Sequence, residues 1–332
     1  MQAIVRILAA GAVTAVSLYF ALRGTEWDEV RGVLQRTHYG WVVAMMLVSV
    51  VVVYVRALRW RVLLTGVGRL PIGPLFSATA VGFMANMILP LRAGEIIRPV
   101  LLGRLANVPV SAALASILLE RLFDLLLLFC FLIALSLTVP VPERMQQWAY
   151  VLAGLIAVLL FLIVVLLRFQ QQALGWIGRG LRHLPGGVGG RITDVLESFL
   201  GGIAGIKDGR TVLTILVYSF GVWTVIAVTF GFGVLALNLQ VPLVAASVSL
   251  MVIVAAFVSL PQAPGFVGTW QAGCVAALAF YGVTKEEAVG YSLVTHVVQL
   301  LANVGLGAIC LVASSTGLRE LATLARREPE KP

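Results

Sequence analysis

Long apolar runs recur along the chain and limit what it can fold into. Four of them are long enough, or nearly so, to cross about 30 Å of hydrocarbon as helices rising roughly 1.5 Å per residue: Val42–Val55, Leu125–Val139, Tyr150–Leu167 and Val212–Leu237. Apolar residues make up 60% of the sequence and charged residues only 12%, a balance that would make a water-soluble domain aggregate. The sequence therefore predicts an all-α polytopic membrane protein.

Basic residues punctuate the apolar runs instead of forming one patch. The excess of Lys and Arg in cytoplasmic loops therefore explains the net charge of +9, and no nucleic-acid partner is expected. With the N terminus inside, most basic residues become cytoplasmic, including Arg56, Arg59 and a basic tail at residues 319–332. Both termini are then cytoplasmic. The run Ile4–Leu22 lacks a clean signal cleavage site and is interpreted as a retained span in the cell membrane.

Two apolar segments are interrupted by proline and glycine, and neither piece of either segment is long enough to span alone. The first, about residues 75–104, is broken at Pro90 and Gly94, and the second, about residues 243–281, is broken between Pro261 and Gly268. If each interrupted segment enters the membrane and leaves it on the side from which it entered, the basic loops stay in the cytoplasm. The resulting fold has six spanning helices plus two re-entrant helical hairpins.

The hairpins occupy matching places in two halves, residues 1–140 and 141–318. Each half contains a span, a surface stretch (Thr25–Tyr39, then about 168–210), a span, a hairpin and a span. The first half starts inside and the second outside, which makes an inverted repeat. Paired interrupted helices point to a transporter site, although two such breaks also arise by chance. An ungapped alignment from Val108 and Val283 places Glu120, Arg121 and Asp124 on Thr295, His296 and Gln299.

Charged residues surround the break of the first hairpin. A half-helix starting near Gly94 would direct free N–H groups and a positive dipole end towards mid-membrane. Arg92 beside it would complete an anion site suited to phosphate. Arg98 either joins this site or lies at the cytoplasmic surface. The candidate binding residues here are Asn86, Pro90, Arg92, Gly94, Glu95 and Arg98.

Three charged residues, Glu120, Arg121 and Asp124, lie within the span that follows. Glu120 and Asp124 are four residues apart, so they share a helix face that should point into the bundle. Two interpretations stay open. Either the three form an ion-pair network that clamps Arg92 and the hairpin, or one carboxylate exchanges a proton or receives a cationic headgroup during transport.

The second hairpin is neutral and offers only backbone and amide hydrogen bonds. Its glycines allow close backbone approach, and its prolines remove donors that would lack partners there. His296 on the following span is either a satisfied interhelical residue or a proton carrier. The candidate binding residues of this half are Pro261, Gln262, Pro264, Gly265, Gly268, Thr269 and His296.

No motif predicts catalysis, a cofactor or a metal. The sequence has no Walker loop, nucleophile elbow or metal-ligand cluster, so no catalytic residue is assigned. Cys130, Cys274 and Cys310 sit in apolar segments without paired spacing and are predicted to be small core residues rather than disulfide or zinc partners.

Three ordered motifs resemble a known family. They are N-x-x-x-P-x-R-x-G-E-x-x-R-P from Asn86, ILLERLFD around Glu120, and PQAPGFVGTWQAG from Pro261. Together they are similar to the lysylphosphatidylglycerol synthase transmembrane region family, also called flippase-like, from roughly Ala44 to Val312. The resemblance implies that this chain is similar to the membrane region of two-part synthases, which is credited with flipping aminoacylated phosphatidylglycerol. In those synthases a separate cytoplasmic domain attaches the amino acid. The chain ends soon after its last span, so we expect that domain, and lysyl transfer, to be absent.

The residues and the resemblance together predict a lipid translocator and not an enzyme. The anionic headgroup of a phospholipid or polyprenyl-phosphate lipid, phosphate first, would enter between the hairpins and pair with Arg92 and Arg121. One alternative is a membrane-embedded enzyme with Glu95 or Asp124 as base. Another is a subunit that presents lipid to a glycosyltransferase or synthase partner, since family members accompany glycosyltransferases and polyprenyl-linked glycolipid pathways.

Overall fold

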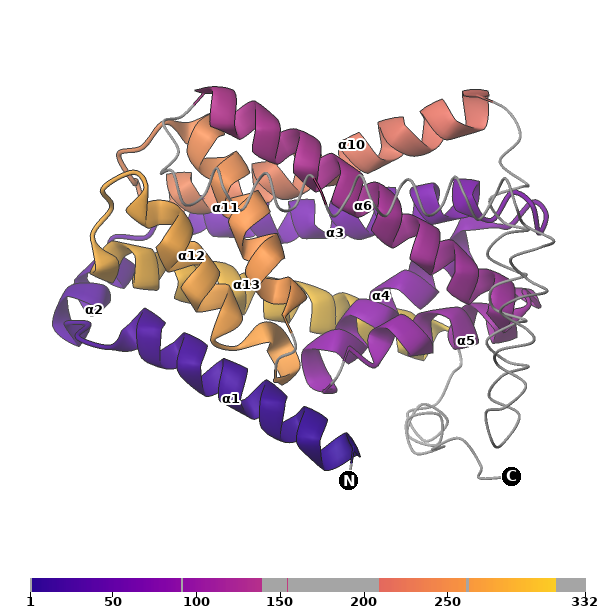
Figure 1. Cartoon of the computed structure of the whole chain (residues 1–332), viewed down its shortest axis with the longest axis horizontal. Coiled ribbons are helices and arrows are strands. Elements are labelled where there is room, and N and C mark those ends of the chain that lie inside the picture. Colours follow the sequence, from indigo (N-terminus) through magenta and orange to yellow (C-terminus); the bar gives the residue numbers. More distant parts are fainter. Residues whose placement is uncertain (1, 91, 139–153, 155–208, 261–262, 315–332) are drawn as a thin grey trace.

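The structure, a computed structural model of the chain, describes residues 2–90, 92–138, 154, 209–260 and 263–314. Every regular element among these residues is helical, which confirms the all-α prediction (Figure 1). The elements are α1 (Gln2–Leu22), α2 (Trp27–Gln35), α3 (Tyr39–Leu63), α4 (Ile72–Ile88), α5 (Gly94–Ala106), α6 (Val110–Thr138), α10 (Gly209–Ala236), α11 (Leu243–Ser259), the 3-10 turn η2 (Pro264–Phe266), α12 (Thr269–Ala279) and α13 (Lys285–Ala313).

Long apolar helices with apolar outer faces indicate that the protein is surrounded by membrane lipid. Among the described residues, α3, α10 and α13 are long and apolar enough to cross a membrane. Helix α6 has 29 residues but carries three charged groups near its middle. Leu47, Val217 and Val312 lie fully outside the core, and hydrocarbon tails are a suitable solvent for such side chains. The fold is that of a polytopic membrane protein, while the number of spans stays a prediction.

Both interrupted segments fold as two helices packed against each other. Helices α4 and α5 pair around the break at Pro90, and α11 pairs with α12 around η2 (Figure 1). The two tips meet, because the Met87 carbonyl lies against Gly265 and the Arg92 guanidinium donates to the Val258 carbonyl. The hairpin geometry is thus present, and its re-entry into a bilayer stays a prediction.

The long helices tie the two halves of the chain together. Helix α3 packs along α10, and α13 packs along α4. One buried apolar cluster gathers residues mainly of α3, α4, α5 and α6, with Ile215 of α10 and Leu311 of α13, and a second gathers residues mainly of α10 to α13. Helix α6 contributes Ile117 to the first and Leu127 to the second. The charged residues of α6 lie between these two contributions, where the clusters join.

Several sequence predictions concern residues outside the described ranges. These are the stretch at about 168–210, the run Tyr150–Leu167, the tail at 319–332, and Pro261 and Gln262. The other predicted surface stretch contains α2, which packs on α13. Cys274 and Cys310 are buried, but Cys130 is exposed. The prediction that Cys130 is a core residue is wrong, because it lies on the outward face of α6.

Candidate functional site

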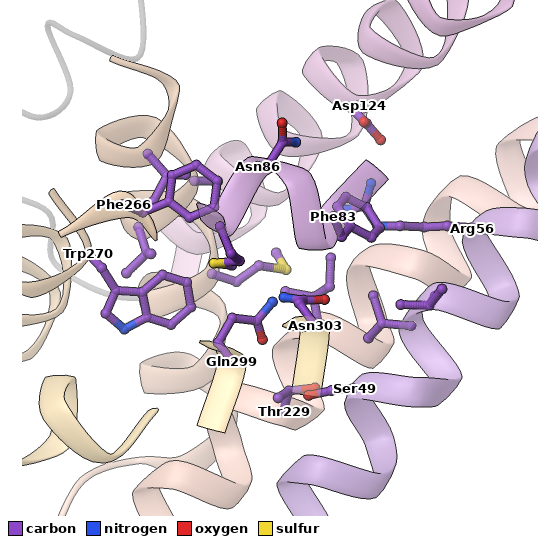
Figure 2. A pocket seen from close by; sticks show the side chains of 18 of the residues that line it. Ser49, Arg56, Phe83, Asn86, Asp124, Thr229, Phe266, Trp270, Gln299 and Asn303 are labelled. Carbon is purple, nitrogen blue, oxygen red and sulfur yellow. The ribbon is translucent and has the colours of Figure 1, made fainter. Parts of the chain in front are cut away.

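A cavity of about 350 Å³ lies where the two hairpin tips meet. Its walls come from α3, α4, α5 and α6 of the first half and from α10, α11, α12 and α13 of the second. Figure 2 shows that Arg56 and Asp124 lie at one end, while Trp270 and Phe266 lie at the opposite end. The cavity therefore has a charged end and a neutral end, contributed largely by different halves of the chain.

The charged end is built around the two carboxylates of α6. Glu120 is fully buried and accepts from both Arg98 Nη1 (3.0 Å) and Arg59 Nη2 (3.0 Å). Asp124 accepts from Arg59 Nη1 (2.6 Å) and from the indole N–H of Trp223 (3.1 Å). Both carboxylates thus face the interior, as their four-residue spacing predicts.

Two more guanidinium groups complete the cluster. Arg121 Nη2 lies 3.0 Å from Glu120 and 3.4 Å from Asp124, and Arg56 Nη1 lies 3.7 Å from Glu120. Four guanidinium groups therefore face two carboxylates, an excess of two positive charges. Buried N–H groups at Nε of Arg59, Arg98 and Arg121, and at Nη2 of Arg98, have no hydrogen-bond partner within the described part of the chain. The charged end is electropositive and has unused donors, which is a suitable environment for an anion.

Three of these arginines lie deeper in the bundle than the distribution of basic residues in the sequence indicates. Arg56 and Arg59 were counted as cytoplasmic, but α3 continues to Leu63 and buries both within the bundle, so that prediction is wrong. Arg98 is buried against Glu120 and does not lie at a surface. Its guanidinium stacks 3.9 Å from the ring centroid of Trp60. The α6 carboxylates therefore hold α3 through Arg59 and the first hairpin through Arg98, and Arg92 is not among the ion-pair partners that they have.

Arg92 instead sits at the contact between the tips. Its side chain is about one-third exposed and lies 3.6 Å from Glu95, besides donating to Val258 on the other hairpin. Its backbone has φ of 53°, a left-handed conformation that costs a non-glycine residue roughly 1–2 kcal/mol. Phe266 at the second tip has φ of 62°. Each hairpin thus turns at a residue held in a strained conformation by its surroundings.

Asn86 and two glycines close the first hairpin. Helix α5 begins at Gly94, as predicted, and the Gly94 N–H donates to Asn86 Oδ1 (2.8 Å). An added Cβ on Gly94 would stand 1.9 Å from the Gly82 carbonyl oxygen, so the backbones touch directly. Pro90 lies in the turn between the two helices. The side chain of Asn86 therefore occupies part of the free helix end that the sequence assigned to an anion.

The second tip has no charge, and its polar groups satisfy one another. His296 Nε2 donates to the Gly265 carbonyl (2.6 Å), and Nδ1 accepts from the Gln271 amide (2.9 Å), with the tautomer assigned from these partners. Gly268 has φ of 85° and packs against Thr14 of α1. Both nitrogens of His296 are occupied, as in the structural interpretation, so it positions the tip.

None of the described candidate binding residues of this half lines the cavity, and this includes Gly265, Gly268 and His296. Thr269 is buried and Pro264 is exposed, and neither side chain lines the cavity. The neutral end is instead formed by residues that the sequence did not single out: Ser49, Thr229, Trp270, Gln299 and Asn303. Asn303 lies one turn beyond Gln299 on the same face of α13, so its helical spacing was the available signal.

Removing the Ser116 hydroxyl tests how much its hydrogen bond to Trp60, the ring that stacks on Arg98, contributes to stability. The buried Trp60 indole N–H donates to Ser116 Oγ (2.8 Å). Ser116→Ala leaves that donor unpaired, which should lower the free energy of unfolding by about 1–3 kcal/mol. Thermal unfolding in detergent measures this. Ser136→Ala, which removes an exposed hydroxyl of the same helix, is the control, and equal melting temperatures for the two variants would contradict the assignment.

The helical fold, the apolar outer faces and the interior ion cluster define a polytopic integral membrane protein. The chain matches the family described as lysylphosphatidylglycerol synthase TM region over residues 7–307, and it belongs to that family, as its three motifs predict. No solved structure matches the chain.

A curated relative is also similar along the whole chain. It is Glycosyltransferase AglD of Haloferax volcanii, 26% identical over 361 aligned positions that cover 98% of this chain and 58% of the relative. The chain thus spans somewhat more than half the length of that protein. The family and the relative together suggest a membrane protein with a lipid-related function.

Proposed function

We propose that this protein moves an anionic lipid between the leaflets of the cell membrane, with the lipid phosphate bound in the cavity between the hairpin tips. The observation that carries the proposal is the excess of two positive charges at one end of that cavity, with buried N–H donors that have no partner among the described residues. Uncompensated charge is expensive inside a membrane protein and marks an ion or substrate path.

The cluster is arranged to present arginine to a ligand while holding it in place. Glu120 and Asp124 fix the guanidinium groups, and Arg121 keeps 39% of its side chain exposed beside the cavity. A phosphate would bind Arg121 with parallel hydrogen bonds and be attracted by Arg98 behind it. The acyl or prenyl chains would stay in the bilayer.

Movement between leaflets would involve the contact between the hairpins. Arg92 bridges from the first tip to the Val258 carbonyl on the second, and the Met87 carbonyl touches Gly265. Rocking of one half against the other would break these contacts and open the cavity to the opposite side. Both termini are placed in the cytoplasm in this proposal, following the distribution of basic residues outside the cluster.

The state of the carboxylates favours transport over catalysis. Asp124 is hydrogen-bonded to Arg59 and Trp223, and Glu95 is paired with Arg92. A carboxylate held by arginine is a poor general base, because the pairing stabilises its charged form. We therefore regard the protein as a translocator and not an enzyme.

Arg121→Gln should slow translocation of an anionic lipid about tenfold or more, since a charged hydrogen bond contributes roughly 1.5–3 kcal/mol. The measurement is dithionite quenching of acyl-chain-labelled phosphatidic acid in proteoliposomes. Arg61→Gln, which removes an exposed arginine of α3, is the matched control. Unchanged rates in Arg121→Gln, or in Arg92→Ala at the tip, would refute this assignment of the site.

The similarity to Glycosyltransferase AglD favours a second candidate, in which the protein acts in the glycosylation of a lipid. It would then either modify the lipid itself or present the lipid to a glycosyltransferase or synthase partner. Conversion of a lipid by the purified protein in detergent, where no leaflets exist, would support the enzyme. A co-purifying transferase together with no translocation by the isolated protein would support the presenting subunit.

A further inference from the structure

The neutral end of the cavity holds amide groups without partners. Gln299 and Asn303 lie one turn apart on α13, and both line the cavity. Asn303 is only 5% exposed, yet neither amide has a hydrogen bond to another described residue. Gln299 is half-buried and both side chains line the cavity, so the two amides are accessible from the cavity and have donors and acceptors available for a ligand there.

Two hydroxyl groups on neighbouring helices face the same space. Ser49 donates to the Met45 carbonyl (2.9 Å), and Thr229 donates to the Val225 carbonyl (2.9 Å), each one turn back on its own helix. With the proton used in this way, each oxygen presents its lone pairs to the cavity. Both residues line the cavity with Gln299 and Asn303, and Figure 2 shows Ser49 and Thr229 below the two amides in this view. Amide donors and hydroxyl acceptors therefore converge on one region.

An aromatic wall borders this region. Trp270 stacks between Phe230 (5.6 Å between ring centroids) and His296 (5.8 Å), and its indole N–H donates to Thr295. The orientation of the ring is thereby fixed beside the cavity, next to Phe266 (Figure 2). Because Phe230 and His296 cover the two faces of the indole, Trp270 contributes a fixed apolar boundary, and the hydroxyls of a polyol would be bound by the amides.

Within the described lining, no carboxylate is left unpaired to neutralise a cationic headgroup. The carboxylates in the described lining are Glu95 and Asp124. Glu95 pairs with Arg92, and Asp124 is bonded to Arg59 and Trp223. An ammonium group would meet the guanidinium excess without a free anion, and its lost hydration would not be replaced.

These observations identify the headgroup. We propose that the site selects an anionic lipid whose phosphate carries an uncharged, hydroxyl-rich headgroup such as glycerol, inositol or a sugar, and that it rejects a cationic headgroup, including a lysyl ester. The phosphate lies at the arginine end, and the hydroxyls lie against Gln299 and Asn303. This inference rests on the proposed function and names the substrate class of the same site.

The test compares acyl-chain-labelled lipids that share a phosphate and differ in the headgroup: phosphatidylglycerol, phosphatidylinositol, phosphatidic acid, phosphatidylethanolamine and lysylphosphatidylglycerol. In proteoliposomes, the two polyol lipids should cross roughly three- to tenfold faster than the last two, which matches one or two hydrogen bonds. The ratio of phosphatidylinositol to phosphatidylglycerol distinguishes a ring polyol from glycerol. Phosphatidic acid reports on the phosphate alone.

Asn303→Leu and Gln299→Leu should each lower the polyol rates three- to tenfold relative to the rate of phosphatidic acid in the same variant. Thr229→Val should reduce polyol transport in the same way. Thr214→Val is its matched control, because Thr214 makes the same bond to its own helix but faces outward. Replacing an unpaired buried amide with leucine should not lower the melting temperature, which separates loss of selectivity from loss of folding.

The measured rates distinguish failure of the headgroup assignment from failure of the proposed translocation. Equal rates for phosphatidylglycerol and lysylphosphatidylglycerol, or an Asn303→Leu variant that slows phosphatidic acid equally, would overturn the headgroup assignment while transport stands. If no lipid crosses, the proposed function fails. Native mass spectrometry of the detergent-solubilised protein then still tests the headgroup, because preferential binding of phosphatidylglycerol over lysylphosphatidylglycerol supports the selection and equal binding refutes it.

Discussion

Replacing Arg59 with alanine is expected to lower the free energy of unfolding by about 3–5 kcal/mol, the usual effect of removing one partner of a buried ion pair. The Arg59 side chain is fully buried and bonds to Asp124 (2.6 Å), Glu120 (3.0 Å) and Ser219 (3.2 Å). Without it, two neighbouring carboxylates remain in the interior with less positive charge around them. Their repulsion and poor solvation oppose packing of α3 against α6.

The measurement is thermal unfolding of the purified variant in detergent, together with its yield from the membrane. Arg61→Ala is the control, because Arg61 lies on the same helix and is exposed. Arg59→Lys should recover part of the stability, since lysine keeps the charge but not the forked geometry that contacts both carboxylates. A melting temperature for Arg59→Ala equal to that of Arg61→Ala would show that the cluster does not hold the fold together.

Gly94→Ala is expected to disrupt the first hairpin and cost about 3 kcal/mol or more, at the upper end for overpacking a tight contact. The new Cβ would lie 1.9 Å from the Gly82 carbonyl and 2.6 Å from Asn86 Oδ1. The first neighbour is backbone, so α4 and α5 must separate. The Gly94–Asn86 hydrogen bond would be lost with the contact.

Thermal unfolding again measures the effect, and translocation should fall because Arg92 and Arg98 follow the same break. Gly73→Ala is the control: Gly73 lies in α4 with no other atom within 4 Å of an added Cβ. It should be neutral or slightly stabilising, since alanine favours a helix. If Gly94→Ala unfolds at the same temperature as Gly73→Ala, the hairpin is not closed by this glycine contact.

Local chemistry made the hairpins predictable. Pro90 and Gly94 end one helix and start the next, and α5 begins at Gly94 because proline and the residues around it cannot continue a helix. The i,i+4 spacing of Glu120 and Asp124 likewise predicts one buried face, because unpaired carboxylates avoid lipid. Both inferences need only a few adjacent residues. The matched positions of the two hairpins then indicate that their tips meet.

The partners of the charges could not be predicted in the same way. Arg59 bonds to Asp124 across 65 residues of sequence, and Trp223 reaches Asp124 across 99. Such pairs depend on how helices pack, which no local spacing encodes. Arg56 and Arg59 also follow the end of an apolar run, so the charge rule assigns them to a loop, whereas α3 continues through them. The neutral amides of α13 gave even less signal, because a lone Asn or Gln in an apolar helix is compatible with many environments.

The wide separation of Arg59 from its carboxylates also affects how the protein is made. The ribosome completes α3 well before Glu120 and Asp124 emerge, so the guanidinium groups of α3 lack their carboxylate partners while the chain is still being synthesised. Holding an arginine at mid-bilayer costs roughly 2.5–3.5 kcal/mol in the insertion machinery. Stable integration of α3 is therefore expected to be delayed until α6 has been synthesised, and nascent chains arrested before that point should remain accessible to quality-control proteases.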